Sequence, residues 1–291
     1  MSQKTLLWVA ALLALVAVGA GGLVWWQQQA PASAPAGPAT AAAPVALAPA
    51  APPAIEPVQP VQPAIRHPLE ADAATSAAAS PQRPLPAPEQ ADAYVADALA
   101  ELLGRKPVLT FLATDGFAAR LVATVDNLDR PLAAARLWPV NPSPGRFQTA
   151  PAADGTLIGA DNTKRYAPFV QFVAGVDAAK AVALYRRLYP LFQHAYENLG
   201  YPGKYFNDRL VKVIDHLLET PEPAGPLKVR LTEVKGPIPS STPWLRYEYE
   251  DPALEARSAG QKILLRMGPE NAARVKARLR EFRIELAAHA R

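Results

Sequence analysis

The hydrophobic and polar residues of this chain fall into three stretches with different patterns. Leu6–Trp26 is a run of 21 residues without a charged or strongly polar side chain. Gln27–Gln90 contains 15 of the 32 prolines, much alanine and almost no large apolar side chains. From Ala91 onwards, apolar residues recur at the spacing of α-helices. The pattern therefore predicts an apolar segment, a linker and one mainly α-helical domain.

The strongest helical pattern lies between Asp177 and Gly200. This spacing predicts a core helix, and it favours core packing of the tyrosines over a platform for glycan stacking. Pro190 lies inside the helix and is expected to kink it or to divide it into two. The apolar and aromatic positions, spaced by three and four residues, are Val182, Tyr185, Tyr189, Phe192, Tyr196 and Leu199.

Other helices are predicted from capping residues and from breaks in the pattern. A cluster of prolines, Pro131, Pro139, Pro142 and Pro144, excludes a long helix in that region. Helices are expected from an Asp92 cap to Gly104, from Asp115 to Leu128, from Asn207 to Thr220, from Asp251 to Gly268, and from Pro269 onwards.

Four short segments with alternating apolar residues predict strands. Arg146–Thr149 and Thr156–Ile158 flank Asp154-Gly155, which is typical of a small hairpin. Leu227–Leu231 and Leu245–Tyr249 are expected to pair in antiparallel fashion.

Apolar side chains and opposite charges set the register of the second pair. Gly236, Pro237 and Pro239 exclude a tight hairpin, so a loose loop of about a dozen residues should join the strands. The sequence thus adds a small antiparallel β element to the helical domain. The expected pairs are Val229 with Tyr249, Leu231 with Tyr247, Lys228 with Glu250 and Arg230 with Glu248.

The first apolar run is long enough to cross a membrane. A helix over Leu6–Trp26 would span about 31 Å, against about 30 Å for the hydrocarbon core of a bilayer. Trp8 and Trp25 stand near its two ends, where indole side chains favour the interfaces. Lys4 precedes the run, and the first charge after it is Glu56. We therefore expect insertion in the cytoplasmic (inner) membrane, with the N-terminus inside and the C-terminal domain in the periplasm. A cleaved signal peptide is the alternative, although cleavable apolar regions are shorter, about 7–15 residues.

A stripe of small residues lies on one face of this run. Ala10, Ala14, Ala17 and Gly21 would let two such helices approach closely and form a weak homodimer. Chance explains the stripe equally well, because alanine is abundant in the segment.

The Ala/Pro-rich stretch predicts a disordered linker. It has too few large apolar side chains to offset the entropy cost of folding. A neutral spacer is favoured over a ligand for a proline-recognising module. The predicted organisation is an N-terminal anchor over residues 1–26, a linker over 27–90 and a soluble helical domain over 91–291.

Positive charge is concentrated near the C-terminus, although the formal net charge is only +4. Arg257–Arg291 contains nine Lys or Arg against three Asp or Glu, whereas Ala91–Ala256 is nearly balanced. This local excess argues against a nucleic-acid partner, which usually requires a broad basic face. Lys276, Arg280 and Arg283 share one helix flank and are the candidate contacts for an anionic partner. Neutralisation by acids of neighbouring elements, or by solvent, is the alternative.

No combination of residues matches a known catalytic, cofactor or metal site. The absence of cysteine excludes disulfides, a thiolate nucleophile and Cys-ligated metals. His194 and His216 lack a second histidine at ligand spacing, so surface positions are favoured for both.

Two polar pairs have spacings that resemble those of catalytic groups. Asp208 and Asp215 share a helix face about 10 Å apart. An ion-pair network with the adjacent Arg209 and Lys212 is favoured there over an inverting glycosidase pair. Ser258 and Lys262 are one helical turn apart, which is not the Ser-Lys spacing of penicillin-binding proteins, and no glycine-rich phosphate loop is present.

Four phrases of the domain resemble a known family. They are similar to the bacterial family called domain of unknown function 3014, over roughly Leu85 to the C-terminus. The resemblance implies an N-terminal membrane anchor, and because the family has no assigned activity it supplies no catalytic residues. The phrases are Tyr185–Phe192, Tyr205–Val211, Ile214–Leu218 and Arg266–Asn271.

These observations predict a single-pass, membrane-anchored protein of the cell envelope. We interpret its domain as a non-enzymatic binding or scaffold domain, held away from the membrane by the linker, with an envelope protein or an anionic polymer as partner. The alternative is an envelope hydrolase whose site is assembled from residues far apart in the sequence. A deep pocket holding reactive carboxylates or His216 would favour the hydrolase.

Overall fold

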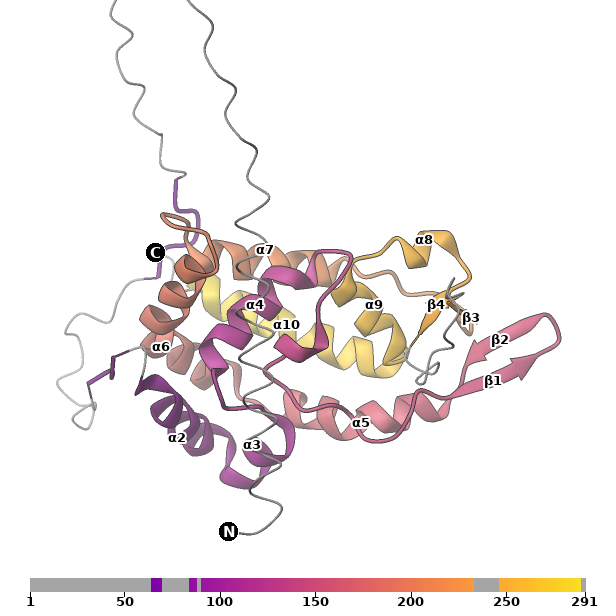
Figure 1. Ribbon diagram of the computed structural model, residues 1–291, viewed down its shortest axis with the longest axis horizontal. Coiled ribbons are helices and arrows are strands. Elements are labelled where there is room, and N and C mark those ends of the chain that lie inside the picture. Colours follow the sequence, from indigo (N-terminus) through magenta and orange to yellow (C-terminus); the bar gives the residue numbers. More distant parts are fainter. Residues whose placement is uncertain (1–63, 70–83, 88–89, 233–245, 289–291) are drawn as a thin grey trace, which may run out of the picture. The chain divides into compact units, whose positions relative to one another are not determined.

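A computed structural model describes residues 64–69, 84–87, 90–232 and 246–288 of the chain (Figure 1). All of these residues belong to one compact unit, Pro60–Arg291. The predicted membrane segment Leu6–Trp26 and most of the predicted loop before the last strand lie outside the described residues. The described elements are α2 (Ala91–Leu103), α3 (Arg105–Phe111), α4 (Phe117–Leu128), the 3-10 helix η2 (Ala135–Leu137), β1 (Thr149–Ala152), β2 (Gly155–Ile158), α5 (Asp161–Ala174), α6 (Ala178–Asn198), α7 (Phe206–Leu218), β3 (Lys228–Leu231), β4 (Tyr247–Tyr249), α8 (Pro252–Glu255), α9 (Ala259–Arg266) and α10 (Pro269–Ala288).

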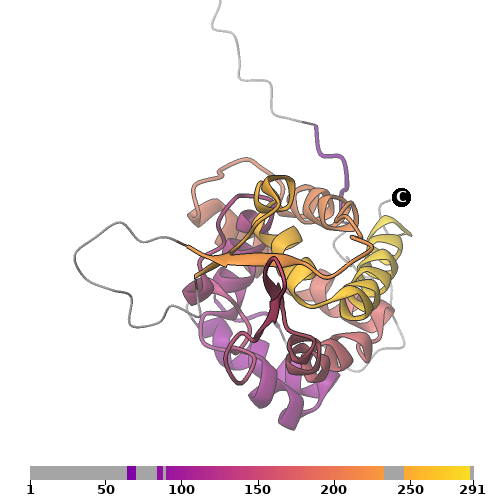
Figure 2. The ribbon, with the colours of Figure 1, turned by 90° about the vertical axis from the view of Figure 1, so that its right-hand side faces the viewer.

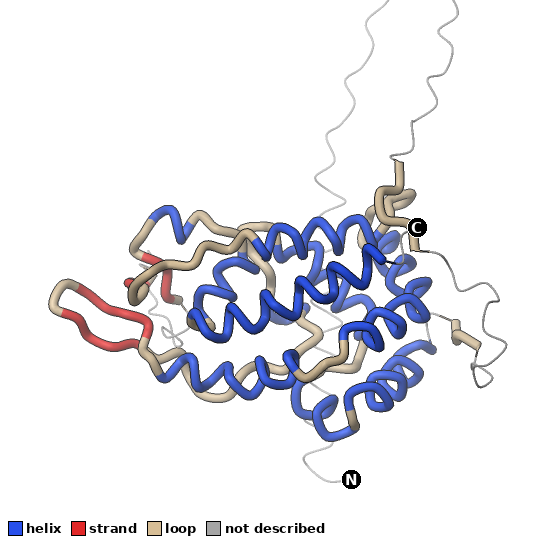
Figure 3. Tube along the Cα trace, turned by 180° about the vertical axis from the view of Figure 1, so that it is seen from behind, coloured by secondary structure: helices blue, strands red, loops and turns tan. Residues whose placement is uncertain are grey.

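The described part is mainly helical and carries a small antiparallel sheet, as the sequence predicts. Helices α4 and α10 each pack against both α6 and α7, while α5 packs along α10 and α2 contacts α4 and α6. The strands and α8 gather at one end of the helical bundle (Figures 1 and 3), and Figure 2 shows that end from the front. Within the described ranges no single helix is long and apolar enough to cross a membrane, whereas α5 and α6, bent by 76°, meet those criteria as a pair.

Helix α6 is the core helix that the hydrophobic spacing predicts. Asp177 caps it by accepting a hydrogen bond from the Lys180 N–H at 3.0 Å. The helix runs without a break through Pro190, so of the two effects expected from this proline, a kink or a division, the division is wrong. Buried residues on both sides of the exposed proline hold the two halves in one core, which offsets the lost backbone hydrogen bond. Those buried residues are Val182, Leu188, Leu191, Phe192 and Tyr196.

Several helix boundaries differ from the prediction. Asp92 lies inside the first turn of α2 and accepts a hydrogen bond from the Gly116 N–H at 2.9 Å, so it links two helices and does not cap one. The helix expected from Asp251 to Gly268 is two helices, because Ser258 caps α9 by accepting from the Gln261 N–H. Helices α3 and α5 were not predicted, because each contains a proline, which normally argues against a helix.

The four strands form one antiparallel sheet in the order β1-β2-β3-β4. The predicted register of β3 and β4 is confirmed, since Val229 pairs with Tyr249, and Arg230 forms the predicted ion pair with Glu248 at 2.7 Å. Lys228 lies opposite Glu250 as expected, since the Glu250 N–H donates to the Lys228 carbonyl at 3.1 Å, but the lysine side chain does not form its ion pair there. Lys228 binds Asp154 instead, because the β1–β2 hairpin lies beside β3 and brings its turn to the lysine.

Candidate functional site

The largest of the cavities described below runs along the outward face of α7. Its volume is about 810 Å³. We call it the α7 cleft and define it by residues 64–67, by Gln193 and Tyr196 of α6, by the α6–α7 loop, and by the lining side chains from Asp208 of α7 to its C-cap Glu219. The cleft therefore joins α7 to a short segment that the sequence assigned to the linker.

Residues 64–69 are held at this cleft through their backbone. The Asp208 carboxylate accepts hydrogen bonds from two consecutive amides, Arg66 N–H at 3.0 Å and His67 N–H at 2.7 Å. The Asn207 amide donates to the His67 carbonyl at 2.9 Å, and Tyr205 Oη accepts from the Leu69 N–H at 2.7 Å. On the segment, these hydrogen bonds involve only backbone N–H and C=O groups, so they do not require particular side chains there.

Buried polar side chains fix the first turn of α7 for this contact. Asn207 is fully buried, and its side-chain oxygen accepts a hydrogen bond from Tyr185 Oη at 3.2 Å. Tyr189 Oη donates to Gln193 Oε1 at 2.9 Å and accepts from the Asn207 N–H at 3.4 Å. Burial raises the pKa of both phenols, so they remain neutral donors at ordinary pH. The amide of Asn207 is therefore oriented before the segment binds.

An ion-pair network anchors α7 to α4 beneath the cleft. Arg209 donates to Asp126 Oδ1 at 2.9 Å and to both carboxylate oxygens of Asp129 at 2.5 and 2.6 Å. Burial alone would raise the pKa of Asp129, but the hydrogen bond and charge of Arg209 outweigh it and lower that pKa. Tyr201 Oη also donates to Asp126, at 3.1 Å. The predicted network of Arg209 with Asp208 and Asp215 is wrong, because the arginine turns toward α4.

The other acids and histidines singled out by the sequence have structural partners. Asp215 binds Arg283 of α10 at 2.9 Å. His216 Nε2 lies 2.9 Å from Ser258 Oγ, so this histidine is part-buried at a helix contact and is not a free surface residue. Ser258 is itself a buried helix cap and does not line the α7 cleft, while Lys262 pairs with Glu255 at 2.8 Å. No group of three or more metal-binding side chains occurs in the described part of the chain.

The three basic residues proposed for an anionic partner do not form one exposed patch. Lys276 is only 4% exposed. It donates to the Thr220 carbonyl at 3.0 Å and to Glu222 at 2.6 Å. Arg283 is paired with Asp215, and Arg280 is exposed. Acids of neighbouring elements thus partner two of the three, which was the alternative that the sequence left open.

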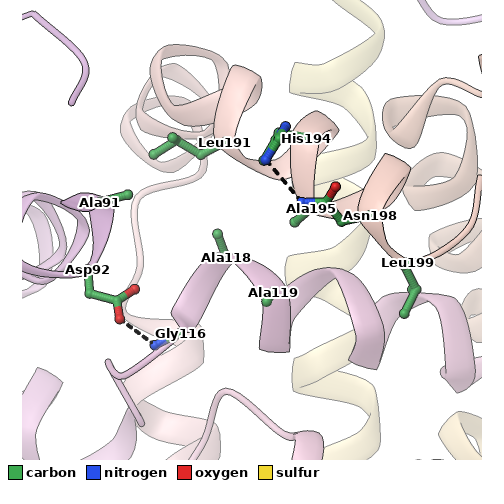
Figure 4. Close-up of a pocket in the computed structure, with 10 residues that line it drawn as sticks. All are labelled: Ala91, Asp92, Gly116, Ala118, Ala119, Leu191, His194, Ala195, Asn198 and Leu199. Carbon is green, nitrogen blue, oxygen red and sulfur yellow. Dashed lines mark hydrogen bonds between the residues drawn. The ribbon is translucent and has the colours of Figure 1, made fainter. Parts of the chain in front are cut away.

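A second cavity, of about 510 Å³, lies between α2, α4 and α6 (Figure 4). Ala91, Ala118 and Leu191 give it an apolar lining. Its polar groups are already paired, Asp92 with the Gly116 N–H and His194 with Asn198. The α7 cleft, where charged groups meet a bound segment, is the better candidate.

Sequence reasoning did not find the docked segment. Its contacts are made by backbone groups, so its side chains carried no signal for docking. Comparison with known proteins gives one match: a family model described as protein of unknown function (DUF3014) covers residues 117–283. No curated protein and no solved structure matches the chain. The matched region runs from α4 into α10 and includes every α7 residue of the cleft.

Proposed function

We propose that this chain, which belongs to the DUF3014 family of proteins of unknown function, is a non-enzymatic binding protein whose α7 cleft takes up an extended peptide backbone. The observation that carries the proposal is the docking of residues 64–69. One carboxylate accepts two successive N–H groups, and the neighbouring amide donates to the carbonyl that follows. Main-chain hydrogen bonds of this kind supply affinity in many peptide-recognition sites.

The side chains of the docked segment support a tolerant mode of recognition. Ile65 and Arg66 are exposed, and His67 is only half-buried. Charge-assisted hydrogen bonds to the Asp208 carboxylate are among the stronger hydrogen bonds in proteins. We infer that residues 64–69 bind the α7 side of the cleft as an internal ligand, and that an extended segment of an envelope protein takes their place in trans.

The hydrolase alternative has less support from this site. A general acid–base pair needs groups that can reach a substrate. Asp208 is engaged by two amides and Asp215 by Arg283, while Ser258 caps a helix outside the cleft. His216 also lines the cleft, but its Nε2 faces the hydroxyl of the buried Ser258 at 2.9 Å. Because each of these groups already has a partner, the site favours binding over hydrolysis.

We also propose that Leu6–Trp26 anchors the chain in the cytoplasmic membrane, with the domain on the periplasmic side. The length of the apolar run and the position of Lys4 support this orientation. A reporter that is active only in an oxidising compartment, fused after Arg291, is expected to be active. The same fusion to a chain that starts at Gln27 is the control and should be inactive. Activity of that control, or inactivity of the full-length fusion, would contradict the orientation.

Limited trypsin digestion tests whether the segment is docked. Trypsin cuts after Arg66, whereas Arg83 is followed by Pro84 and is a poor site. Asp208→Ala removes the acceptor of both amides that flank the Arg66–His67 bond. We expect cleavage after Arg66 to accelerate about thirtyfold, which corresponds to a loss of about 2 kcal/mol in docking.

Glu219→Ala is the matched control for this digestion. Glu219 lines the same cleft on α7 but makes no hydrogen bond to residues 64–69. Its cleavage rate should equal that of the unchanged protein. Equal rates for all three proteins would show that the segment is not docked, and the proposal would lose its basis.

A further inference from the structure

A third cavity lies at the sheet end of the bundle and shares no lining residue with the α7 cleft. Its volume is about 300 Å³, and it opens between the loop before β1, the start of α5, β4 and the end of α9. Four aromatic side chains and three arginines line it, with no acidic residue among the lining. We call it the arginine–aromatic pocket; its charged and aromatic members are Trp138, Arg146, Phe147, Arg165, Tyr166, Tyr247 and Arg266.

Two of these arginines are held in place by neutral acceptors. Arg165 donates to the carbonyls of Pro144 and Gly145 at 2.9 and 3.1 Å, and to the buried Asn162 side chain at 3.0 Å. Arg266 donates to the Tyr247 carbonyl at 2.6 Å. Within the described part of the chain neither guanidinium forms an ion pair. Both guanidinium groups are thus fixed in position by neutral acceptors and not by an ion pair, which raises the potential inside the pocket.

Two hydrogen-bond donors of the lining residues also lack acceptors. Trp138 Nε1 and Arg266 Nε are buried and have no partner in the described part of the chain. A buried donor without an acceptor is costly, and native proteins rarely keep one without a reason. The acid Glu255, whose pKa the charge of Arg266 helps to lower, is hydrogen-bonded to Lys262 and to the Tyr249 N–H. Glu255 therefore does not supply the acceptor that Trp138 Nε1 and Arg266 Nε lack.

The aromatic side chains give the pocket an apolar wall beside the charges. The rings of Phe147 and Tyr247 lie 5.4 Å apart, and the Arg266 guanidinium lies 5.9 Å from the centre of the Phe147 ring. A volume near 300 Å³ is at the lower end of the range for small-molecule sites. The pocket fits a compact ligand with one anionic end and one flat apolar end.

We propose that the arginine–aromatic pocket is a binding site for a small ligand whose carboxylate or phosphate group is attached to a planar ring. Arg165 and Arg266 contact the anion, because a guanidinium matches the oxygen geometry of both groups. The aromatic wall packs against the ring. This site is separate from the peptide-binding cleft, and the proposal does not depend on the function of that cleft.

Calorimetric titration of the full-length chain with phenyl phosphate, benzoate and benzamide tests the site. Benzamide is the neutral analogue of benzoate and has nearly the same shape. Phenyl phosphate and benzoate are expected to bind with dissociation constants of about 1 mM or below, whereas benzamide should not bind. Arg266→Gln should weaken both anions at least tenfold, and Arg266→Lys should restore part of the affinity.

Two further variants separate the pocket from general surface charge and from misfolding. Arg257→Gln removes an exposed arginine outside the pocket and should leave the affinity unchanged. Trp138→Phe keeps an aromatic side chain but removes the indole N–H together with the five-membered ring, so it should weaken binding even if Arg266→Gln does not fold. The proposal is overturned if phenyl phosphate fails to bind at about 10 mM, if benzamide binds as tightly as benzoate, or if Arg257→Gln weakens binding as much as the pocket variants do.

Discussion

Replacing Arg209 by alanine is expected to destabilise the domain by about 2–3 kcal/mol, because it removes the ion-pair partner of Asp129 and one of the two arginines that pair with the buried Asp126. Asp126 is only 4% exposed, and Arg209 binds both its side chain and its backbone carbonyl. The same guanidinium also holds both oxygens of Asp129. One substitution thus breaks every bond between the base of α7 and these two acids of α4. Chemical denaturation of the two proteins measures the difference in the free energy of unfolding.

The effect of Arg209→Ala should depend on pH. The pKa of Asp129 in the folded protein is lower than its ordinary value of 3.8, because Arg209 outweighs the opposing effect of burial. The stabilisation from this pair is therefore present above that ordinary value and is lost as the pH falls through the lowered pKa. The difference between the two proteins should narrow at strongly acidic pH. A constant difference over that range would contradict this account of Asp129.

Lys212→Ala is the matched control for the arginine. Lys212 is exposed on the same helix, and its removal should change stability by less than about 0.5 kcal/mol. A similarly small effect of Arg209→Ala would show that the α4–α7 ion pairs contribute little. In that case the position of the cleft would depend on the apolar core alone.

A peptide of residues 61–73 is expected to bind the cleft in trans once the internal segment is disabled. The double variant Arg66→Pro/His67→Pro removes both N–H groups that donate to Asp208 and leaves the α7 side of the cleft unchanged. Fluorescence anisotropy with a labelled peptide should show binding to this variant at least tenfold tighter than to the unchanged chain. Adding Asp208→Ala should then weaken the peptide about a hundredfold, the equivalent of about 2.7 kcal/mol.

Changes in the peptide itself distinguish backbone from side-chain recognition. A peptide with Arg66→Ala should keep its affinity, because the bonds involve only the main chain. A peptide that carries both prolines should not bind. If the alanine peptide loses affinity and the proline peptide keeps it, the cleft recognises side chains, and the proposed mode of binding is wrong.

The elements that could be predicted from the sequence are those defined by residues close to one another along the chain. The register of β3 and β4 follows from alternation and opposite charge within two short segments, and the pairs of Val229 with Tyr249 and Arg230 with Glu248 are present. Helix α6 has a clear apolar stripe, so its bounds were predictable within two residues. Helix α5 was missed because Pro168 interrupts its pattern, and its stability comes from packing along α10.

The candidate sites could not be predicted because they depend on contacts between distant residues. A carboxylate that accepts main-chain N–H groups leaves no side-chain pattern on the segment it binds, so nothing in the linker sequence pointed to Asp208. The burial of Lys276 likewise depends on the carbonyl of Thr220 and on Glu222, which belong to another element. The pocket arginines come from three separate parts of the chain and converge only in the fold.

The prolines of the linker determine where it can dock. Asp208 and Tyr205 require N–H groups at positions 66, 67 and 69, and the position between the last two is Pro68. A shift of one residue in one direction places Pro68, which has no N–H, opposite Asp208, and a shift in the other direction places it opposite Tyr205. The Ala/Pro-rich composition therefore restricts the register in which the linker can bind. In most of its four-residue stretches, a proline stands at one of the three positions where the cleft needs an N–H donor.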